Sequence, residues 1–295
     1  SCEYKEGIDS KPNLTVKSTF ENWKKLAGKF VSPLKALLNK TVVIKGSFIE
    51  LLKLNGYFSG NGNVEIPENA YTYNRKVANG LPKINKVLVI IGSPRKEKGL
   101  TDFFASKFIE GMKNKNAVVE KIFISDYKIH PCDGCFFCFL GKKECKFKGR
   151  DDFDLIFKKF IEADFVLFAT PVYAWSFTTQ FKTFYDRCFI LVNPYLNYRK
   201  KDKLLVGFYN YPEMPMIGML GVCALPYKSE FKALQIMMKK YSKYYEMPLL
   251  CEVLITNSMA YLIKDIYDKN VVNQFNAIVR AGEELIEKNR ISRKT

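Results

Sequence analysis

From Lys86 onward, short apolar runs alternate with helical patterns, and this alternation constrains the fold more than any other feature of the sequence. The runs are too short for helices and mostly apolar, as in strands that a parallel sheet buries on both faces. They are Val87–Ile91, Ala117–Ile124, Phe165–Thr170, Met216–Ala224 and Leu249–Ile255. Apolar residues at helical spacing predict helices at Thr101–Lys113, after Asp151 and Asp152, around Phe181, Phe184 and Phe189, at Glu230–Tyr245 and at Val271–Lys288. Five strands separated by helices imply a parallel sheet with right-handed crossovers.

The loop after the first run decides between the common doubly wound sheets. A dinucleotide-binding Rossmann domain would have G-x-G-x-x-G here, and none follows Ile91. A Walker loop is excluded because Glu97, not Gly, stands five positions after Gly92. The loop is rich in Ser, Arg, Lys and Thr, as in flavodoxin-like proteins, which hold flavin mononucleotide (FMN) between strands one and three. We therefore predict a flavodoxin-like α/β fold, a doubly wound five-stranded parallel sheet of order 2-1-3-4-5.

The first 85 residues have a different pattern and predict a smaller α+β segment. Leu14–Thr19 and Thr41–Lys45 are expected to be strands, and Glu21–Leu38 and Phe48–Leu54 helices. Residues 59–84 are polar and contain Gly, Asn and Pro, which is the composition of a linker. We expect an accessory segment at 1–58, a linker at 59–85 and the flavodoxin-like domain at 86–295.

The sequence GSPRKEKGLT, residues 92–101, has the composition of a phosphate site. A phosphate needs converging backbone N–H groups, hydroxyls and a cation, and a helix N-terminus provides the first of these. The candidate residues are Ser93, Arg95, Lys96, Gly99, Leu100 and Thr101. An ordinary polar turn with a Thr cap would look the same, and spacing alone does not separate the two.

The sequence TPVYAWSFTTQFK, residues 170–182, follows the third run and suits a flat aromatic ring. Such a ring needs apolar and aromatic surface together with hydrogen bonds at its polar edge. The candidates are Pro171, Val172, Tyr173, Ala174 and Trp175. The alternative, core aromatics, is serious in a chain with 24 Phe and 17 Tyr. Ligand binding is favoured because both loops follow strand ends at the switch point of the sheet.

Four cysteines crowd one loop with the spacing C-x2-C-x2-C-x6-C. Cys132, Cys135, Cys138 and Cys145 are candidate ligands of a [4Fe–4S] cluster or of zinc, and reduced or disulfide-forming thiols are the third reading. A ferredoxin run differs, because here the last gap is six residues and Lys146 follows. Since other cysteines stand in apolar settings, one metal site in a reducing cytoplasm fits better than a disulfide framework.

These motifs resemble, in their order, the NADPH-dependent FMN reductase superfamily, and residues 86–290 resemble the iron–sulfur flavoproteins in particular. The motifs are GSPRKEKGLT, the cysteine loop, RDD and TPVY…FYDR. The resemblance implies that Ser93, Arg95, Leu100 and Thr101 hold the FMN phosphate, and that residues 171–175 line the ring. Leu100 departs from relatives that often have Asn. The resemblance also implies a homodimer or higher homo-oligomer, and the Asp186–Arg187 pair is expected to support the helix and loop.

Charge and composition exclude several other classes. The formal net charge is +17, but the lysines are spread along the whole chain, which indicates a solvated surface and no nucleic-acid site. An anionic dinucleotide or an acidic electron-transfer partner would suit this field. No apolar stretch reaches the ~20 residues of a membrane span. His130, the only histidine, is expected to be structural, and no catalytic acid–base residue is predicted.

The N-terminal segment has a weaker likeness of its own. Residues 10–57 resemble the latter half of a sterol-carrier-type lipid-binding domain, in the phrase FENWKKLA and in KGS before the last predicted helix. The front half of such a domain is missing from this sequence. We therefore expect a fragment or an accessory lobe, with a dimerisation or lid element as the alternative.

Three functions remain open at this stage. The first is an FMN-dependent oxidoreductase that takes electrons from NAD(P)H or ferredoxin, with a [4Fe–4S] cluster as an option, and passes them to a small molecule or a protein. The second is a flavin electron carrier without enzymatic activity. The third is a lipid- or ligand-binding module with a structural flavodoxin-like domain.

Overall fold

The chain divides into two compact units, residues 1–69 and 70–295. The computed structural model describes residues 14–19, 42–46, 81–135, 137–138, 144–199, 204–209, 213–262 and 269–292. In the first unit, β1 (Leu14–Ser18) and β2 (Val42–Gly46) pair antiparallel, and Leu14 lies opposite Gly46. Both strands match the predicted ranges within one residue. The two helices expected beside them, and the predicted linker up to residue 80, lie outside the described residues.

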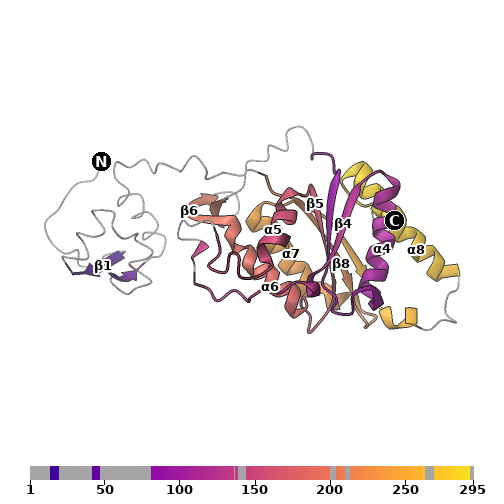
Figure 1. Cartoon of the computed structure of the whole chain (residues 1–295), viewed down its shortest axis with the longest axis horizontal. Coiled ribbons are helices and arrows are strands. Elements are labelled where there is room, and N and C mark those ends of the chain that lie inside the picture. Colours follow the sequence, from indigo (N-terminus) through magenta and orange to yellow (C-terminus); the bar gives the residue numbers. More distant parts are fainter. Residues whose placement is uncertain are drawn as a thin grey trace. The chain divides into compact units, whose positions relative to one another are not determined.

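The second unit is built on a five-stranded parallel sheet (Figure 1). Its strands are β3 (Lys86–Ile91), β4 (Val118–Phe123), β5 (Phe165–Pro171), β8 (Met216–Val222) and β9 (Leu249–Ile255). They stand in the order β4-β3-β5-β8-β9, and every neighbouring pair is parallel. This is the order 2-1-3-4-5, so the flavodoxin-like fold is confirmed.

Helices cover both faces of the sheet, as the continuous apolar strands require (Figure 1). On one face lie α5 (Phe153–Glu162), α6 (Thr179–Arg187) and α7 (Lys232–Tyr245), and on the other α4 (Leu100–Asn114) and α8 (Lys269–Lys288). Side chains of β3 alternate between the two cores: Leu88 and Ile90 join the first, and Val87, Val89 and Ile91 the second. No helix among the described residues is long and apolar enough to cross a membrane.

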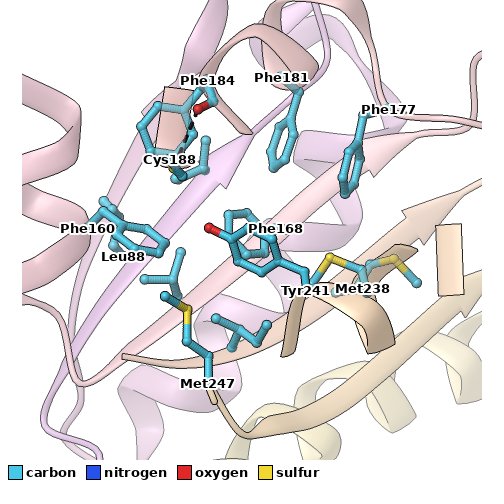
Figure 2. Close-up of a cluster of buried hydrophobic side chains, with 14 of the residues drawn as sticks. Leu88, Phe160, Phe168, Phe177, Phe181, Phe184, Cys188, Met238, Tyr241 and Met247 are labelled. Atoms are coloured by element: carbon cyan, nitrogen blue, oxygen red, sulfur yellow. Dashed lines mark hydrogen bonds between the residues drawn. The ribbon is translucent and has the colours of Figure 1, made fainter. Parts of the chain in front are cut away.

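The core on the α5–α6–α7 face is largely aromatic. Figure 2 shows Phe168 of β5 among rings from the covering helices, with Phe160, Phe181 and Tyr241 around it. The ring of Phe168 meets those of Phe181 and Tyr241 edge-on, at centroid distances of 5.4 and 6.4 Å. Many of the chain's aromatic residues are thus core, but Tyr173 and Trp175 do not belong to it, since they are 47% and 61% exposed.

Two parts of the fold differ from the sequence prediction. The sequence analysis predicts no strand between Phe189 and Met216, yet β6 (Val192–Arg199) and β7 (Leu204–Tyr209) form an antiparallel two-stranded sheet. Pro and Lys in this stretch obscured the β-forming Val, Leu, Tyr and Phe. The helix around Phe181 ends at Arg187, so Phe189 lies in the short 3₁₀ helix η5 (Cys188–Leu191).

Candidate functional site

The carboxyl ends of β3 and β5 bring the two candidate loops together. These strands are neighbours in the sheet, while β4 pairs with the other side of β3. The chain therefore leaves β3 and β5 in opposite lateral directions, which makes a switch point at which open α/β sheets bind ligands. The predicted phosphate residues lie in the loop after β3 and at the start of α4, and the predicted ring residues are Pro171, which ends β5, and the four residues after it.

The loop after β3 has the geometry of an anion cradle. Ser93 is buried, and its Oγ accepts the amide of Arg95 at 3.3 Å. Gly99 is the N-cap of α4 and offers no side chain to cap it, so the first amides of α4, those of Leu100 and Thr101, have no side-chain cap. A Cβ on Gly99 would lie 2.7 Å from Ser93 Oγ. Glycine therefore keeps the hydroxyl and the helix N-terminus open to the same ligand.

The two cations of this loop have different partners. Arg95 is exposed, and its side chain forms no ion pair within the described part of the chain. Lys96 pairs with Asp126 of η3 (Ile124–Asp126), which follows β4. The hydrogen bond and the charge of Asp126 raise the pKa of Lys96. Of the two, Arg95 is therefore the cation available to a phosphate, and Asp126 is a partner that the sequence did not indicate.

The loop after β5 makes a tight turn with its aromatic side chains facing solvent. Tyr173 and Ser176 exchange both backbone hydrogen bonds, at 3.1 and 2.9 Å. Between them Ala174 and Trp175 have positive φ angles of 46° and 58°, as in a type I′ turn. Residues other than glycine rarely adopt such backbone angles, and each residue that does costs of order 1–3 kcal/mol. The surrounding structure must therefore hold this turn in place.

One buried hydrogen bond joins the two loops. Thr178, the N-cap residue of α6, donates its Oγ1 proton to the carbonyl of Gly92 at 2.7 Å. Gly92 in turn donates its amide to the carbonyl of Ala169 in β5 at 2.7 Å. The loop after β5 (residues 172–178, the ring loop) and the loop after β3 (residues 92–99, the phosphate loop) are thus fixed to each other. Sequence analysis missed Thr178, although a Thr immediately before a helical pattern is a recognisable N-cap signal.

A third loop, after β8, also reaches the site. Trp175 Nε1 donates to Glu230 Oε2 of η6 (Lys228–Phe231) at 2.8 Å. Five large apolar side chains in the loops after β5, β8 and β9 are at least 47% exposed, and we call them the apolar rim: Tyr173, Trp175, Leu225, Tyr227 and Met259. Exposed apolar groups gathered at one edge of a sheet mark a binding surface more often than a bare solvent face.

The cysteine loop (residues 130–151) begins after β4 and η3, at this same edge of the sheet. Cys132 and Cys135 are exposed, while Cys138 is half-buried and packs against the core on the α5–α6–α7 face. Burial, and then the neighbouring thiols of Cys145, Cys132 and Cys135, raise the pKa of Cys138 to about 11.

The donor set of this loop suits a soft metal, but the thiols are not drawn together. The seven cysteines among the described residues form no disulfide, so each can lose its proton and bind a metal as a thiolate. Within the described ranges, no three His, Cys, Asp or Glu side chains are arranged to hold a metal ion. The chemistry of the loop fits a cluster or zinc, and its ligands would have to converge on binding.

A buried ion pair lies where the cysteine loop begins and ends. Arg187, at the end of α6, contacts Asp151 at 2.7 Å, and both side chains are only 1% exposed. The same Arg187 nitrogen donates to the carbonyl of His130 at 2.9 Å. The expectation that Arg187 supports the loop agrees with these contacts, whereas Asp186 pairs with Lys182 on the surface of α6.

The two aspartates before α5, Asp151 and Asp152, bind the chain that enters the cysteine loop. Asp152 is the N-cap residue but makes no side-chain cap, and its carboxylate accepts the amide of Lys128 at 2.8 Å instead. Asp151 accepts the amides of Phe153 and His130, at 3.2 and 2.9 Å. The RDD sequence therefore ties the start of α5 to the chain that enters the cysteine loop.

Comparisons with known proteins show which families this chain is similar to. Residues 85–208 match the family model of NADPH-dependent FMN reductases. An iron–sulfur flavoprotein of Archaeoglobus fulgidus is 41% identical over 102 residues, which are 35% of this chain and 44% of that protein. An iron–sulfur flavoprotein of Methanocaldococcus jannaschii is 38% identical over 103 residues, 35% of this chain and 50% of that protein. An azoreductase structure from Bacillus anthracis has a TM-score of 0.48 at 15% identity and covers 68% of this chain and 100% of that one.

The chain spans about half the length of the flavoproteins that it matches. The resemblance to NADPH-dependent FMN reductases, first seen in the order of the motifs over residues 86–290, is confirmed for residues 85–208. The resemblance to iron–sulfur flavoproteins is confirmed over about a third of the chain. At a TM-score below one half, the structural likeness adds nothing to the fold, which rests on the strand order. The sterol-carrier likeness falls mostly outside the described residues and stays a prediction.

Proposed function

We propose that this chain is an FMN-dependent oxidoreductase that draws electrons from NAD(P)H. The observation that most supports this is the hydrogen bond from Thr178 to Gly92 at the switch point of the sheet. It joins the loop that would bind the FMN phosphate to the loop that would bind the flavin ring. The match of residues 85–208 to the NADPH-dependent FMN reductases supports the same assignment. FMN, when bound, accepts a hydride from the nicotinamide and passes the two electrons to an acceptor.

The residues after β3 fit the phosphate of FMN. The amides of Leu100 and Thr101 and the hydroxyl of Ser93 are the proposed hydrogen-bond donors, and Arg95 the cation. Lys96 would contribute only if it left Asp126. An Asn side chain in place of Leu100 would offer one more hydrogen bond, but the backbone amide at this position does not depend on the side chain.

The residues after β5 fit the flavin ring. Pro171 and Val172 are half-buried and offer an apolar floor, while Tyr173 and Trp175 are exposed enough to stack on the ring. The hydrogen bonds of the turn use the amides of Tyr173 and Ser176. In the described part of the chain, the amides of Ala174 and Trp175 have no other partner and are the proposed donors to the polar edge of the ring.

The proposal for the cysteine loop is a [4Fe–4S] cluster held by Cys132, Cys135, Cys138 and Cys145. Four cysteines in one loop, in a chain similar to iron–sulfur flavoproteins, favour it over zinc. Ferredoxin stays the alternative donor, the acceptor is a small molecule or a protein, and a homo-oligomer is expected. Anaerobic preparation with iron and acid-labile sulfide assays tests the cluster, and a chain without either after reconstitution contradicts it.

One experiment tests the flavin assignment and separates the enzyme from a carrier. The full chain is purified, its visible spectrum recorded, and FMN titrated while its fluorescence is followed. Bleaching of the bound flavin by NADPH or NADH in an anaerobic stopped-flow supports the reductase. Flavin binding without reduction by either nicotinamide supports a carrier or a ferredoxin-fed enzyme. A chain that stays colourless and quenches no added FMN contradicts the proposed function altogether.

A further inference from the structure

Helix α6 connects all three loops of the candidate site. At its N-cap, Thr178 bonds to the phosphate loop through Gly92, and its preceding turn is the ring loop. At its other end, Arg187 reaches both ends of the cysteine loop, through the carbonyl of His130 and the carboxylate of Asp151. One rigid element thus relates the proposed flavin loops to the proposed cluster loop.

Arg187 contacts residues at both ends of the cysteine loop. Its Nη1 donates to His130 and to Asp151 Oδ2, and its Nη2 lies 3.4 Å from Asp151 Oδ1. Asp151 also accepts the amide of His130, so the two ends of the loop are bonded directly as well. The guanidinium packs between the rings of Phe147 and Phe153, at 5.2 and 4.5 Å from their centroids. The first cysteine, Cys132, lies two residues beyond His130.

Stability alone does not account for this pair. A buried ion pair often contributes less than well-packed apolar side chains of the same volume, because both charges lose their hydration. Among the described residues, Arg187 Nε is buried without a hydrogen-bond partner, and an unpaired buried donor is destabilising. What the pair does provide is direction, since a planar guanidinium fixes its acceptors in a fork. A contact that is costly and directional, and that lies at the two ends of a loop of thiols, is suited to holding that loop in place.

We propose that Arg187 and Asp151 are positioning residues that hold both ends of the cysteine loop on α6, at a constant position relative to the flavin loops. The inference rests on the proposed function only in what the loop would bind. The position of the loop itself is a property of the chain, and it is measurable without FMN or iron.

Site-resolved alkylation of Cys138 tests the proposal. Cys138 is half-buried against the core, so its reaction rate reports whether the loop stays seated. The full chain, reduced and free of cofactors, is treated with iodoacetamide and mapped by mass spectrometry, as wild type, as Arg187→Lys and as Lys182→Ala. Lysine keeps the charge at position 187 but loses the fork. Lys182→Ala breaks the exposed pair with Asp186 on the same helix and is the matched control.

We expect iodoacetamide to alkylate Cys138 at least about fivefold faster in Arg187→Lys than in wild type, because the loop opens locally. Lys182→Ala should stay at the wild-type rate, and the buried Cys188, Cys223 and Cys251 should react equally slowly in all three proteins. A wild-type rate at Cys138 in folded Arg187→Lys overturns the proposal. Equal acceleration at the three buried cysteines overturns it as well, because the pair would then support only global stability.

A measurement on the wild-type chain covers the case in which Arg187→Lys does not fold. The amides of His130 and Phe153 both donate to Asp151. In a hydrogen-exchange measurement they should be protected as strongly as the amides of α6. Exchange of these two amides at the rate of an unprotected loop overturns the proposal. If the chain binds neither FMN nor iron, the proposed function fails, while alkylation and exchange still decide whether the pair holds the loop.

Discussion

The candidate site depends on single contacts that a one-residue change would remove. Gly99 shows this most directly, because the space that a Cβ would fill is also the space between the Ser93 hydroxyl and the start of α4. The neighbouring Lys98 is exposed and lies in the same loop, so it offers a comparison at nearly the same place along the chain.

Gly99→Ala should weaken FMN binding about tenfold, equivalent to about 1.4 kcal/mol. The reason is that the added methyl would lie 2.7 Å from Ser93 Oγ and displace the hydroxyl from the proposed phosphate position. Fluorescence titration with FMN measures the effect, and Lys98→Ala should bind within about twofold of wild type. Unchanged affinity in a folded Gly99→Ala protein would show that the phosphate binds elsewhere.

Asp151 should make the stability of the chain sensitive to acid. Burial alone would raise the pKa of this carboxyl, but hydrogen bonds from Arg187 and from the amides of His130 and Phe153 outweigh it and lower the pKa. Because the folded pKa is depressed, the stabilisation is present above the unfolded value of about 3.9 and is lost as the pH falls through the lower folded value. The free energy of unfolding, measured with urea from pH 6 down to pH 3, should therefore fall more steeply in wild type than in Asp151→Asn. Parallel curves would mean that the pair contributes nothing to acid sensitivity.

At the scale of elements, the packing of α4 on α8 depends on glycine. A Cβ at Gly111 of α4 would collide with the carbonyl of Val279, and one at Gly282 of α8 with the carbonyl of Phe108. These neighbours are backbone atoms, which cannot rotate away as a flexible side chain could. The two helices cover one face of the sheet, and α4 is the helix whose N-terminus faces the proposed phosphate.

Gly111→Ala should destabilise the fold by about 1–3 kcal/mol, because overpacking separates the helices. The gain in helix propensity, about 1 kcal/mol, has the opposite sign and is smaller than a backbone collision. Urea denaturation measures the change, and Lys113→Ala on the exposed side of α4 should stay within about 0.5 kcal/mol of wild type. A Gly111→Ala protein as stable as wild type would show that α4 and α8 have room to move apart.

The elements themselves were predictable to a different degree in different places. The five central strands and the helices between them follow from runs and periodicity, because both faces of the sheet are buried and the pattern is strong. The pair β6–β7 was missed, since Pro194 and the Lys-rich stretch between the two strands have the composition of a loop. The bonds of Thr178, Asp126 and Glu230 to the candidate loops could not be predicted, because their partners are 30 to 86 residues away in sequence.

At the scale of the whole molecule, charge is the dominant property. A formal net charge of +17 produces a positive field that attracts anions over distances beyond direct contact. Among described residues near the site, many lysines are engaged in exposed pairs of small individual value, such as Lys96 with Asp126 and Lys182 with Asp186. The field is therefore expected to affect the rate of encounter with an anionic dinucleotide more than the stability of the fold.

The value of kcat/KM for NADPH should fall as ionic strength rises, because the Debye length shortens from about 30 Å at 0.01 M to about 10 Å at 0.1 M. NADH lacks the 2′-phosphate and should show a shallower dependence, which makes it the matched comparison. Steady-state kinetics in a salt series measures both. Equal slopes for the two nucleotides would mean that the net charge does not steer the donor.

The sequence by itself determined the sheet, its strand order and the loops that could hold a flavin and a metal, since burial on both faces and residue chemistry are written in local patterns. It did not determine which groups meet. Only the tertiary structure brought Thr178 to Gly92, and Arg187 to both ends of the cysteine loop. The physical reason is that these contacts join residues far apart along the chain, and their geometry exists only after the helices have packed on the sheet.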